Sequence, residues 1–402
     1  MNQAITAASS AHVDTPHRIS GSRLEMAGLI AIAAVAGTLQ FSIAASQILL
    51  TIAAVCWIGL LIVERERFEA PRFFWPLIAY AAITLVSAAF SLDPRESFID
   101  SKQLVLFLIV PIVYRFATGS RGLTMMTVVL SCAAVSALVG IFQYGILHYD
   151  NLGQRPQGTL GHYMTYSGLL MLVIGVALAR VLFGLGERTW AALVMPALGF
   201  AVALSFTRSA AVGACAAAAL LLALKDFRLL AVLPIVAAIF FAAAPGKVAA
   251  RMTSMFNQQD ATRRDRLAML REGEHMIEAH PLTGVGPNMV LRVYPEFRDP
   301  GAVEKLNPHL HNVPLQIAAE RGLPALLIWV WFLGTLTLDL GRSFYAGKQR
   351  FLSAAGLAAI ASMLAAGLFE YNFGDSEFLM LFLIIVTLPF AAERVRTLNY
   401  EV

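Results

Sequence analysis

The sequence predicts an all-α integral membrane protein of about twelve transmembrane helices, interrupted by one long loop. Of its 402 residues, 58% are hydrophobic and only 14% are charged, and the mean hydropathy is +0.68. Ordinary soluble domains contain about 45–50% apolar and about 25% charged residues. This composition excludes most soluble folds, disordered chains and nucleic-acid-binding proteins, and we expect no nucleic-acid partner.

The apolar stretches follow one another along the chain, and a membrane-spanning helix needs roughly 20 mostly apolar residues. About 22 polar, Ser/Ala-rich residues come first and contain no apolar core, so we expect a short tail rather than a cleaved signal peptide. The three cysteines lie within apolar stretches, which is typical of membrane helices and not of a disulfide framework or zinc site. Spans are predicted at 24–44, 47–63, 73–90, 103–117, 122–146, 163–183, 189–206, 209–224, 229–245, 316–339, 353–369 and 376–392.

The distribution of Lys and Arg predicts the orientation, because short cytoplasmic loops are enriched in both. With the N-terminus in the cytoplasm, sixteen of the 30 basic residues fall in inner segments and four in short outer loops. The other ten lie between Lys247 and Arg321, in one long outer segment, and long loops contribute little to this rule. We therefore expect both termini to be cytoplasmic, and the net charge of +4 is mainly a topology signal.

One outer loop, residues 246–315, separates an N-terminal membrane part (1–245) from a C-terminal one (316–402). Loops of this length are usually functional or disordered. Within it, Asp265–Ala279 is predicted to form an amphipathic helix with Leu267, Leu270 and Ile277 on its apolar stripe. The helix should end at His280-Pro281, before a Gly-Val-Gly-Pro turn at 284–287. It could lie on the membrane interface or cap the helix bundle, and the two alternatives are compatible.

Arginines on the outer side are candidates for binding an anion. Arg208 joins two predicted spans, and an arginine near a membrane span is costly unless it has a partner, a function or a route to the interface. Arg263, Arg264 and Arg266 open the loop helix, and the guanidinium fork matches phosphate oxygens. The alternative for these three is a solvated charged face.

His309 and His311 precede the tenth predicted span. Two histidines could bind a metal, but no Asp, Glu or Cys stands nearby at a typical ligand spacing, so we expect no metal. A histidine in a loop is more often structural. Here, however, arginines on the same side of the membrane would favour a neutral His311 ring, which suits a general base.

These residues resemble motifs of the O-antigen ligase family. His311-Asn312, followed after nine residues by Gly322, resembles the family's His-Asn motif, within Asn-x-His-x-His-Asn-x-x-Leu-Gln-x-x-x-Glu-x-Gly. Arg266-Leu267 followed by Pro281-Leu-Thr-Gly-Val-Gly-Pro287 is similar to its loop helix and turn. Ser205-Phe-Thr-Arg208-Ser209 resembles its membrane Ser/Thr-Arg-Ser element, and Gly158-Thr-Leu-Gly-His162 a fourth, weaker one. Ala325 departs from the ligase pattern, which bears on the subfamily and not on the superfamily.

The resemblance implies a GT-C-like glycosyltransferase bundle in the bacterial inner membrane, with a periplasmic active site. The donor would be O-antigen on undecaprenyl diphosphate, and the acceptor a sugar of the lipid A–core oligosaccharide. The family's base matches His311, and its two essential arginines match Arg208 and Arg266. We add a set of substrate-binding candidates on the same side: Arg263, Arg264, His309, Asn312, Arg155 and His162.

The chemistry of such a transfer agrees with this set of residues. A glycosyl diphosphate is already activated, so it needs positive charge at the leaving group rather than a general acid. A sugar hydroxyl needs a base, and attack opposite the leaving group inverts the anomeric centre. Fixed arginines can replace a divalent cation, so we expect no cofactor, no metal and surrounding lipids as the only further partner. The alternatives are an O-antigen polymerase, a protein O-oligosaccharyltransferase and, outside enzymes, an anion or bicarbonate transporter.

Overall fold

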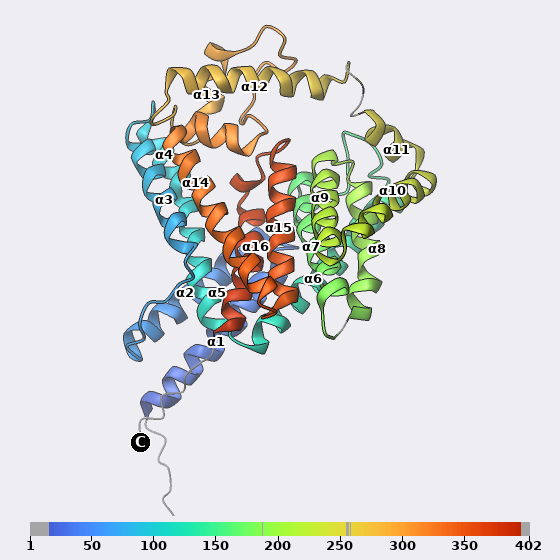
Figure 1. The fold of residues 1–402 in the computed structure, drawn as a ribbon. Helices are drawn as coiled ribbons and strands as arrows, with labels where there is room; N and C mark the ends of the chain where they lie inside the picture. The colour runs from blue at the N-terminus through green and yellow to red at the C-terminus, as the bar shows by residue number, and fades with distance from the viewer. Residues whose placement is uncertain (1–15, 187, 255–256, 258, 395–402) are drawn as a thin grey trace, which may run out of the picture.

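Long apolar helices run side by side in the computed structural model, and the helices of one long loop cover one end of this bundle (Figure 1). The structure describes residues 16–394 except 187, 255–256 and 258. Within these residues no strand occurs. In chain order the elements are α1 (Pro16–Thr38), α2 (Ile43–Val63), α3 (Phe74–Ala89), α4 (Pro94–Asp100), η1 (Ser101–Leu108), α5 (Ile109–Phe116), α6 (Ser120–Gly145), α7 (Tyr163–Phe183), α8 (Arg188–Leu204), α9 (Arg208–Lys225), η2 (Phe227–Ala231), α10 (Val232–Ala243), α11 (Gly246–Thr253), α12 (Ala261–Ala279), α13 (Val290–Phe297), α14 (Val313–Tyr345), α15 (Arg350–Gly367), η4 (Asn372–Gly374) and α16 (Ser376–Glu393).

Eight helices of the described chain are long and apolar enough to cross a membrane. Three further apolar helices are shorter, with 10–17 residues. The chain is therefore a multi-pass helical membrane protein, and the number of twelve spans stays a prediction. The described start of α1 and the end of α16 lie at the end of the bundle opposite α12 and α13 (Figure 1). Which of these ends faces the cytoplasm also stays a prediction.

Two expected boundaries near the N-terminus are wrong. Helix α1 begins at Pro16, so residues 16–22, which we expected in the tail, are helical. The first helix ends at Thr38 rather than near 44, because the Ser42 side chain accepts a hydrogen bond from Ala45 N and caps α2. The expected tail up to residue 15 and the inner-side Arg396 lie outside the described residues.

The centre of the bundle is formed by α7, α15 and α16, which are buried on nearly every side. Small residues allow these helices to approach closely, as is usual in membranes. A Cβ added to Gly175 would lie 3.1 Å from the Cβ of Ala358, and one added to Gly213 would lie 2.8 Å from the carbonyl oxygen of Ser362. The position of α9 against α7 and α15 fixes where its first residue, Arg208, emerges at the loop end.

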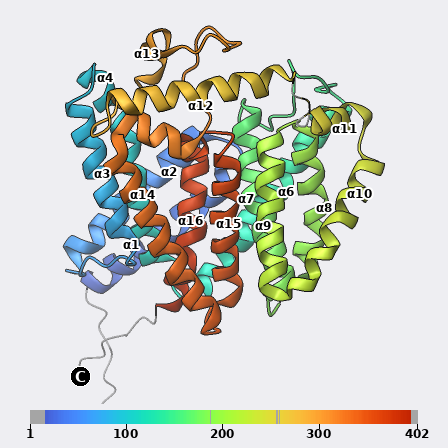
Figure 2. The ribbon, with the colours of Figure 1, turned by 45° about the horizontal axis from the view of Figure 1, so that its top comes forward.

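The loop between α10 and α14 folds into helices that lie across one end of the bundle (Figures 1 and 2). The predicted helix over Asp265–Ala279 is present as α12, which runs from Ala261 to Ala279. It begins four residues earlier than predicted because the Asp260 side chain caps its first turn. The predicted apolar stripe is only partly buried: Leu267 and Leu270 are exposed, whereas Met269 and Met276 pack in a small core with α13 and α14. Ile277, the third residue of the predicted stripe, also packs against this core, whereas Leu267 and Leu270 line a cavity. The helix therefore covers the end of the bundle, one of the two predicted positions.

Two backbone hydrogen bonds, which we call the latch, join the middle of this loop to α14. Val285 N donates to Ala319 O at 2.9 Å, and Gly286 N donates to Glu320 O at 2.9 Å. Gly322 has a φ of +81° inside α14, and a Cβ there would lie 2.1 Å from the carbonyl oxygen of Leu282. The Gly-Val-Gly turn and the Glu-x-Gly end of the His-Asn motif thus meet and hold the loop on the bundle.

Candidate active site

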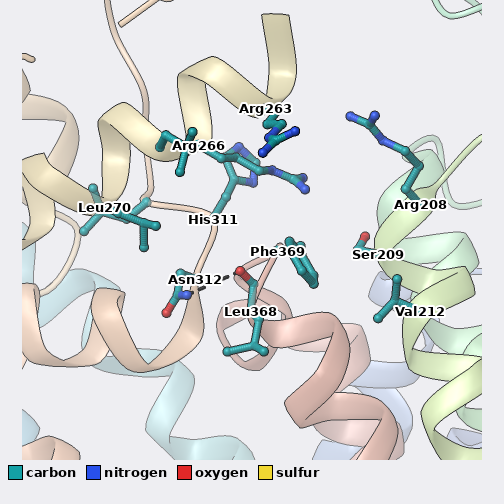
Figure 3. Close-up of a pocket in the computed structure, with 12 residues that line it drawn as sticks. Arg208, Ser209, Val212, Arg263, Arg266, Leu270, His311, Asn312, Leu368 and Phe369 are labelled. Atoms are coloured by element: carbon teal, nitrogen blue, oxygen red, sulfur yellow. Dashed lines mark hydrogen bonds between the residues drawn. The ribbon is translucent and has the colours of Figure 1, made fainter. Parts of the chain in front are cut away.

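A cavity of about 350 Å³ opens at the loop end of the bundle. Arg208 approaches it from the start of α9, and Arg263 and Arg266 approach it from α12, with His311 beneath α12 (Figure 3). The rest of its wall is mostly apolar and comes from α9, α12 and the segments next to α14 and α15: Ser209, Val212, Leu267, Leu270, Leu310, Asn312, Leu368 and Phe369. Three of the predicted arginines and the predicted base therefore share one space.

Arg208 is held in place by the loop. A kink at Phe206, with a φ of +57°, ends α8, and α9 begins at Arg208. Its Nη1 donates to Ser254 Oγ at 3.2 Å, and its Nη2 donates to Asp260 Oδ1 at 3.1 Å. Two of its N–H groups are thus engaged, and the others remain for a ligand. The first turn of α9 also has backbone N–H groups without helical partners, which favour an anion.

Arg266 and Arg263 lie one turn apart on α12 and face the same cavity. Arg266 is largely buried, its guanidinium carbon lies 6.0 Å from the centroid of the Phe369 ring, and its Nε has no hydrogen-bond partner. Burial lowers the pKa of Arg266, and the nearby charge of Glu370 partly offsets this effect. Arg264 is exposed and does not line the cavity. The predicted group of three arginines therefore contributes two to this space.

His311 adopts a φ of +47°. The carboxylate of Glu370, which is distant in the sequence, lies beside its ring. Its Nδ1 lies 3.2 Å from both carboxylate oxygens of Glu370. The His309 ring centroid lies 4.2 Å from that of His311, and His309 Nε2 lies 3.6 Å from Glu370 Oε1. Burial alone would raise the pKa of Glu370, but hydrogen bonds with His309 and His311 hold it well below its ordinary value.

This contact fixes the tautomer of His311. An ionised carboxylate can only accept hydrogen bonds, so Nδ1 of His311 carries the proton that faces Glu370. In the neutral ring, Nε2 is then the nitrogen with a free lone pair. Asn312 has a different role, because its side chain accepts from Leu315 N at 3.0 Å and caps α14 while its Nδ2 donates to Leu368 O.

A second cavity, of about 500 Å³, lies on the bundle side of His311 and shares His311 and Ser209 with the first. Its lining contains no Lys or Arg but includes two carboxylates, Glu370 and Asp375, together with His309 and several aromatic rings. His162 also lines it, and a polar chain runs from His162 through Thr165 to Asp375. The two cavities on either side of His311 therefore differ in charge.

Arg155 lies outside the lining of both cavities. Its guanidinium stacks on the Tyr163 ring, 4.1 Å from the centroid, and its charge acts on Arg208 and Arg251. It therefore adds to the positive field of the site without lining the space itself.

Several residues of the site were not predicted from the sequence. Glu370 follows the eleventh predicted span, and Arg251 and Asp260 lie in the loop, where nothing in their local sequence separates them from other charged residues. Glu370 also changes the argument about metals, because His309, His311 and Glu370 offer ligand atoms within 4.8 Å of one another. The site could thus hold a cation, and metal independence stays a prediction.

The comparison with known families found a match. Residues 191–330 match a family model described as O-antigen ligase. The match covers about a third of the chain and includes Arg208, Arg266, His311 and Gly322. It confirms the predicted resemblance to the O-antigen ligase superfamily. No curated protein matches the chain.

Proposed function

We propose that this membrane protein is an O-antigen ligase, which transfers O-antigen polysaccharide from undecaprenyl diphosphate to a sugar hydroxyl of the lipid A–core oligosaccharide. The observation that carries the proposal is the cavity shared by Arg208, Arg263, Arg266 and His311, within a region matched by the family model. The reaction takes place at the periplasmic face of the bacterial inner membrane, where the loop end of the bundle lies.

The arginine-lined cavity fits the diphosphate end of the donor. Arg208 and Arg266 bind the diphosphate, and Arg263 adds charge at the same cavity. Preorganised cations stabilise the negative charge that develops on the leaving group as the glycosidic bond breaks. The apolar part of the wall, which includes Leu267, Leu270 and Phe369, accommodates the first isoprene units of the lipid.

His311 acts as the general base at the boundary between the two cavities. Its Nε2 accepts the proton of the acceptor hydroxyl while Glu370 holds Nδ1. The hydroxyl oxygen bonds to the anomeric carbon, the bond from that carbon to the diphosphate oxygen breaks, and undecaprenyl diphosphate leaves. An acceptor that reaches His311 from the second cavity attacks opposite the diphosphate, so the configuration inverts.

The proposal is tested in a deletion strain by the lipopolysaccharide ladder and by the pool of lipid-linked O-antigen. A ligase predicts that O-antigen is lost from the lipid A–core while the lipid-linked polymer remains. Wild-type protein restores the ladder, and His311→Ala does not, although it reaches the membrane in equal amount. Loss of the polymer itself would show a polymerase instead, and an unchanged ladder would contradict both.

A further inference from the structure

Arg251, from α11, stands beside the proposed diphosphate site without lining its cavity. Its side chain is 16% exposed, and its Nη1 lies 3.7 Å from Asp260 Oδ2. Its buried Nε has no hydrogen-bond partner. Burial lowers the pKa of Arg251, and the positive charges of Arg208 and Arg155 lower it further. Burying the charge of Arg251 next to other positive charges costs free energy, which suggests that this arginine has a function.

Asp260 contacts both Arg208 and Arg251. One of its oxygens, Oδ1, accepts from Arg208 Nη2 at 3.1 Å and from the backbone N–H of Arg263 at 3.1 Å, while Oδ2 faces Arg251. The side chains of Arg208 and Asp260 are only 10% and 11% exposed, so solvent screens their charges weakly. Asp260 thus anchors Arg208 and at the same time places a negative charge next to the cation that should bind the donor.

A one-to-one pair of Arg208 and Asp260 would be neutral and would attract a diphosphate poorly. With Arg251 on the other carboxylate oxygen, the group of three carries one net positive charge, and the carboxylate is shared. We propose that Arg251 is a positioning residue, which keeps the charge of Arg208 available to the donor diphosphate by sharing Asp260. This inference rests on the proposed function, because it takes the diphosphate as the ligand of Arg208.

Four proteins test the charge arrangement: wild type, Arg251→Gln, Asp260→Asn and the double variant. Each is purified in detergent, and its affinity for inorganic pyrophosphate is measured by calorimetry, with its melting temperature as a measure of folding. We expect Arg251→Gln to bind pyrophosphate about tenfold more weakly. Asp260→Asn, which retains the helix cap, should bind at least as tightly as wild type, and the double variant should return close to wild type.

Arg292→Gln is the matched control, because it also removes a loop arginine that pairs with an aspartate, here Asp93 at the start of α4. Arg292 Nη1 lies 2.7 Å from Asp93 Oδ2, away from the cavity, and we expect no change in affinity. The inference is overturned if Arg251→Gln binds pyrophosphate like wild type, if the double variant binds as weakly as Arg251→Gln, or if wild type does not bind pyrophosphate. The binding measurement does not depend on transfer, so a chain that shows the expected order but no transfer would contradict only the proposed function.

Discussion

The carboxylate of Glu370 lies 3.2 Å from Nδ1 of His311, although 59 positions separate the two residues in the chain. Glu370 comes from the turn after α15, and His311 from the segment before α14, so the packing of these two helices sets the contact. A histidine held by a carboxylate in this way has one fixed tautomer and a fixed ring orientation. The pair therefore orients the histidine that we propose as the general base.

Replacing Glu370 with Gln should lower the rate of transfer about 100-fold, because the base loses its fixed tautomer and the charge that stabilises its protonated form. The KM for the lipid-linked donor should change little, since the carboxylate does not line the arginine cavity. Glu278→Gln, at an exposed position of α12, serves as control. A variant with the wild-type turnover number would remove Glu370 from the mechanism.

Replacing Arg208 with Lys should reduce transfer by about 100-fold, because an ammonium keeps the charge but loses the planar fork that contacts Ser254 and Asp260. The same fork binds the diphosphate in the proposed mechanism. Arg264→Lys should leave transfer unchanged, since this exposed arginine does not line the cavity. Turnover and donor KM of both purified variants check this. Equal rates for the two variants would show that Arg208 supplies only a charge.

Transfer by purified protein should survive treatment with EDTA, because the arginines supply the positive charge at the leaving group. The contrasting outcome is specific: if a cation binds between His309, His311 and Glu370, EDTA abolishes transfer and added metal restores it. Measurement of bound metal in wild type and in His309→Gln then locates the ion. His309→Gln alone should retain most of the activity of the metal-free enzyme.

Glu272, on the buried face of α12, should make the loop less stable as the pH rises. Burial raises the pKa of Glu272, and the charges of Asp265 and Asp299 add to this effect, although hydrogen bonds from Asp299 and Tyr294 oppose it. A group with a raised pKa in the folded state stabilises that state below its unfolded value of about 4.3 and loses this contribution as the pH rises through the folded value. Melting temperatures of Glu272→Gln and wild type should therefore diverge in favour of the variant between pH 5 and pH 8. Parallel curves would contradict this assignment.

The sequence was sufficient to predict a site residue when its neighbours along the chain indicate where that residue lies. Arg208 stands between two apolar stretches, and His311 stands in a loop with its motif, so both could be assigned to one site. Glu370 could not, because its role comes from a contact between α14 and α15. The sequence also did not show which apolar residues of α12 are buried: Met269 lies in the small core and Ile277 packs against it, while Leu267 lines the cavity.

Gly284 and Gly322 lie next to the backbone hydrogen bonds of the latch, and their positions have a consequence for genetics. A Cβ at Gly284 would lie 2.2 Å from the carbonyl carbon of Glu320, and both glycines have positive φ, so any side chain displaces the loop from the bundle. For the ligase that we propose, a random screen for loss of O-antigen should therefore return two groups of alleles. Those at the arginines and His311 leave normal amounts of protein in the membrane, whereas those at the two glycines deplete it. The amount of protein on an immunoblot would then distinguish variants that impair catalysis from variants that impair folding.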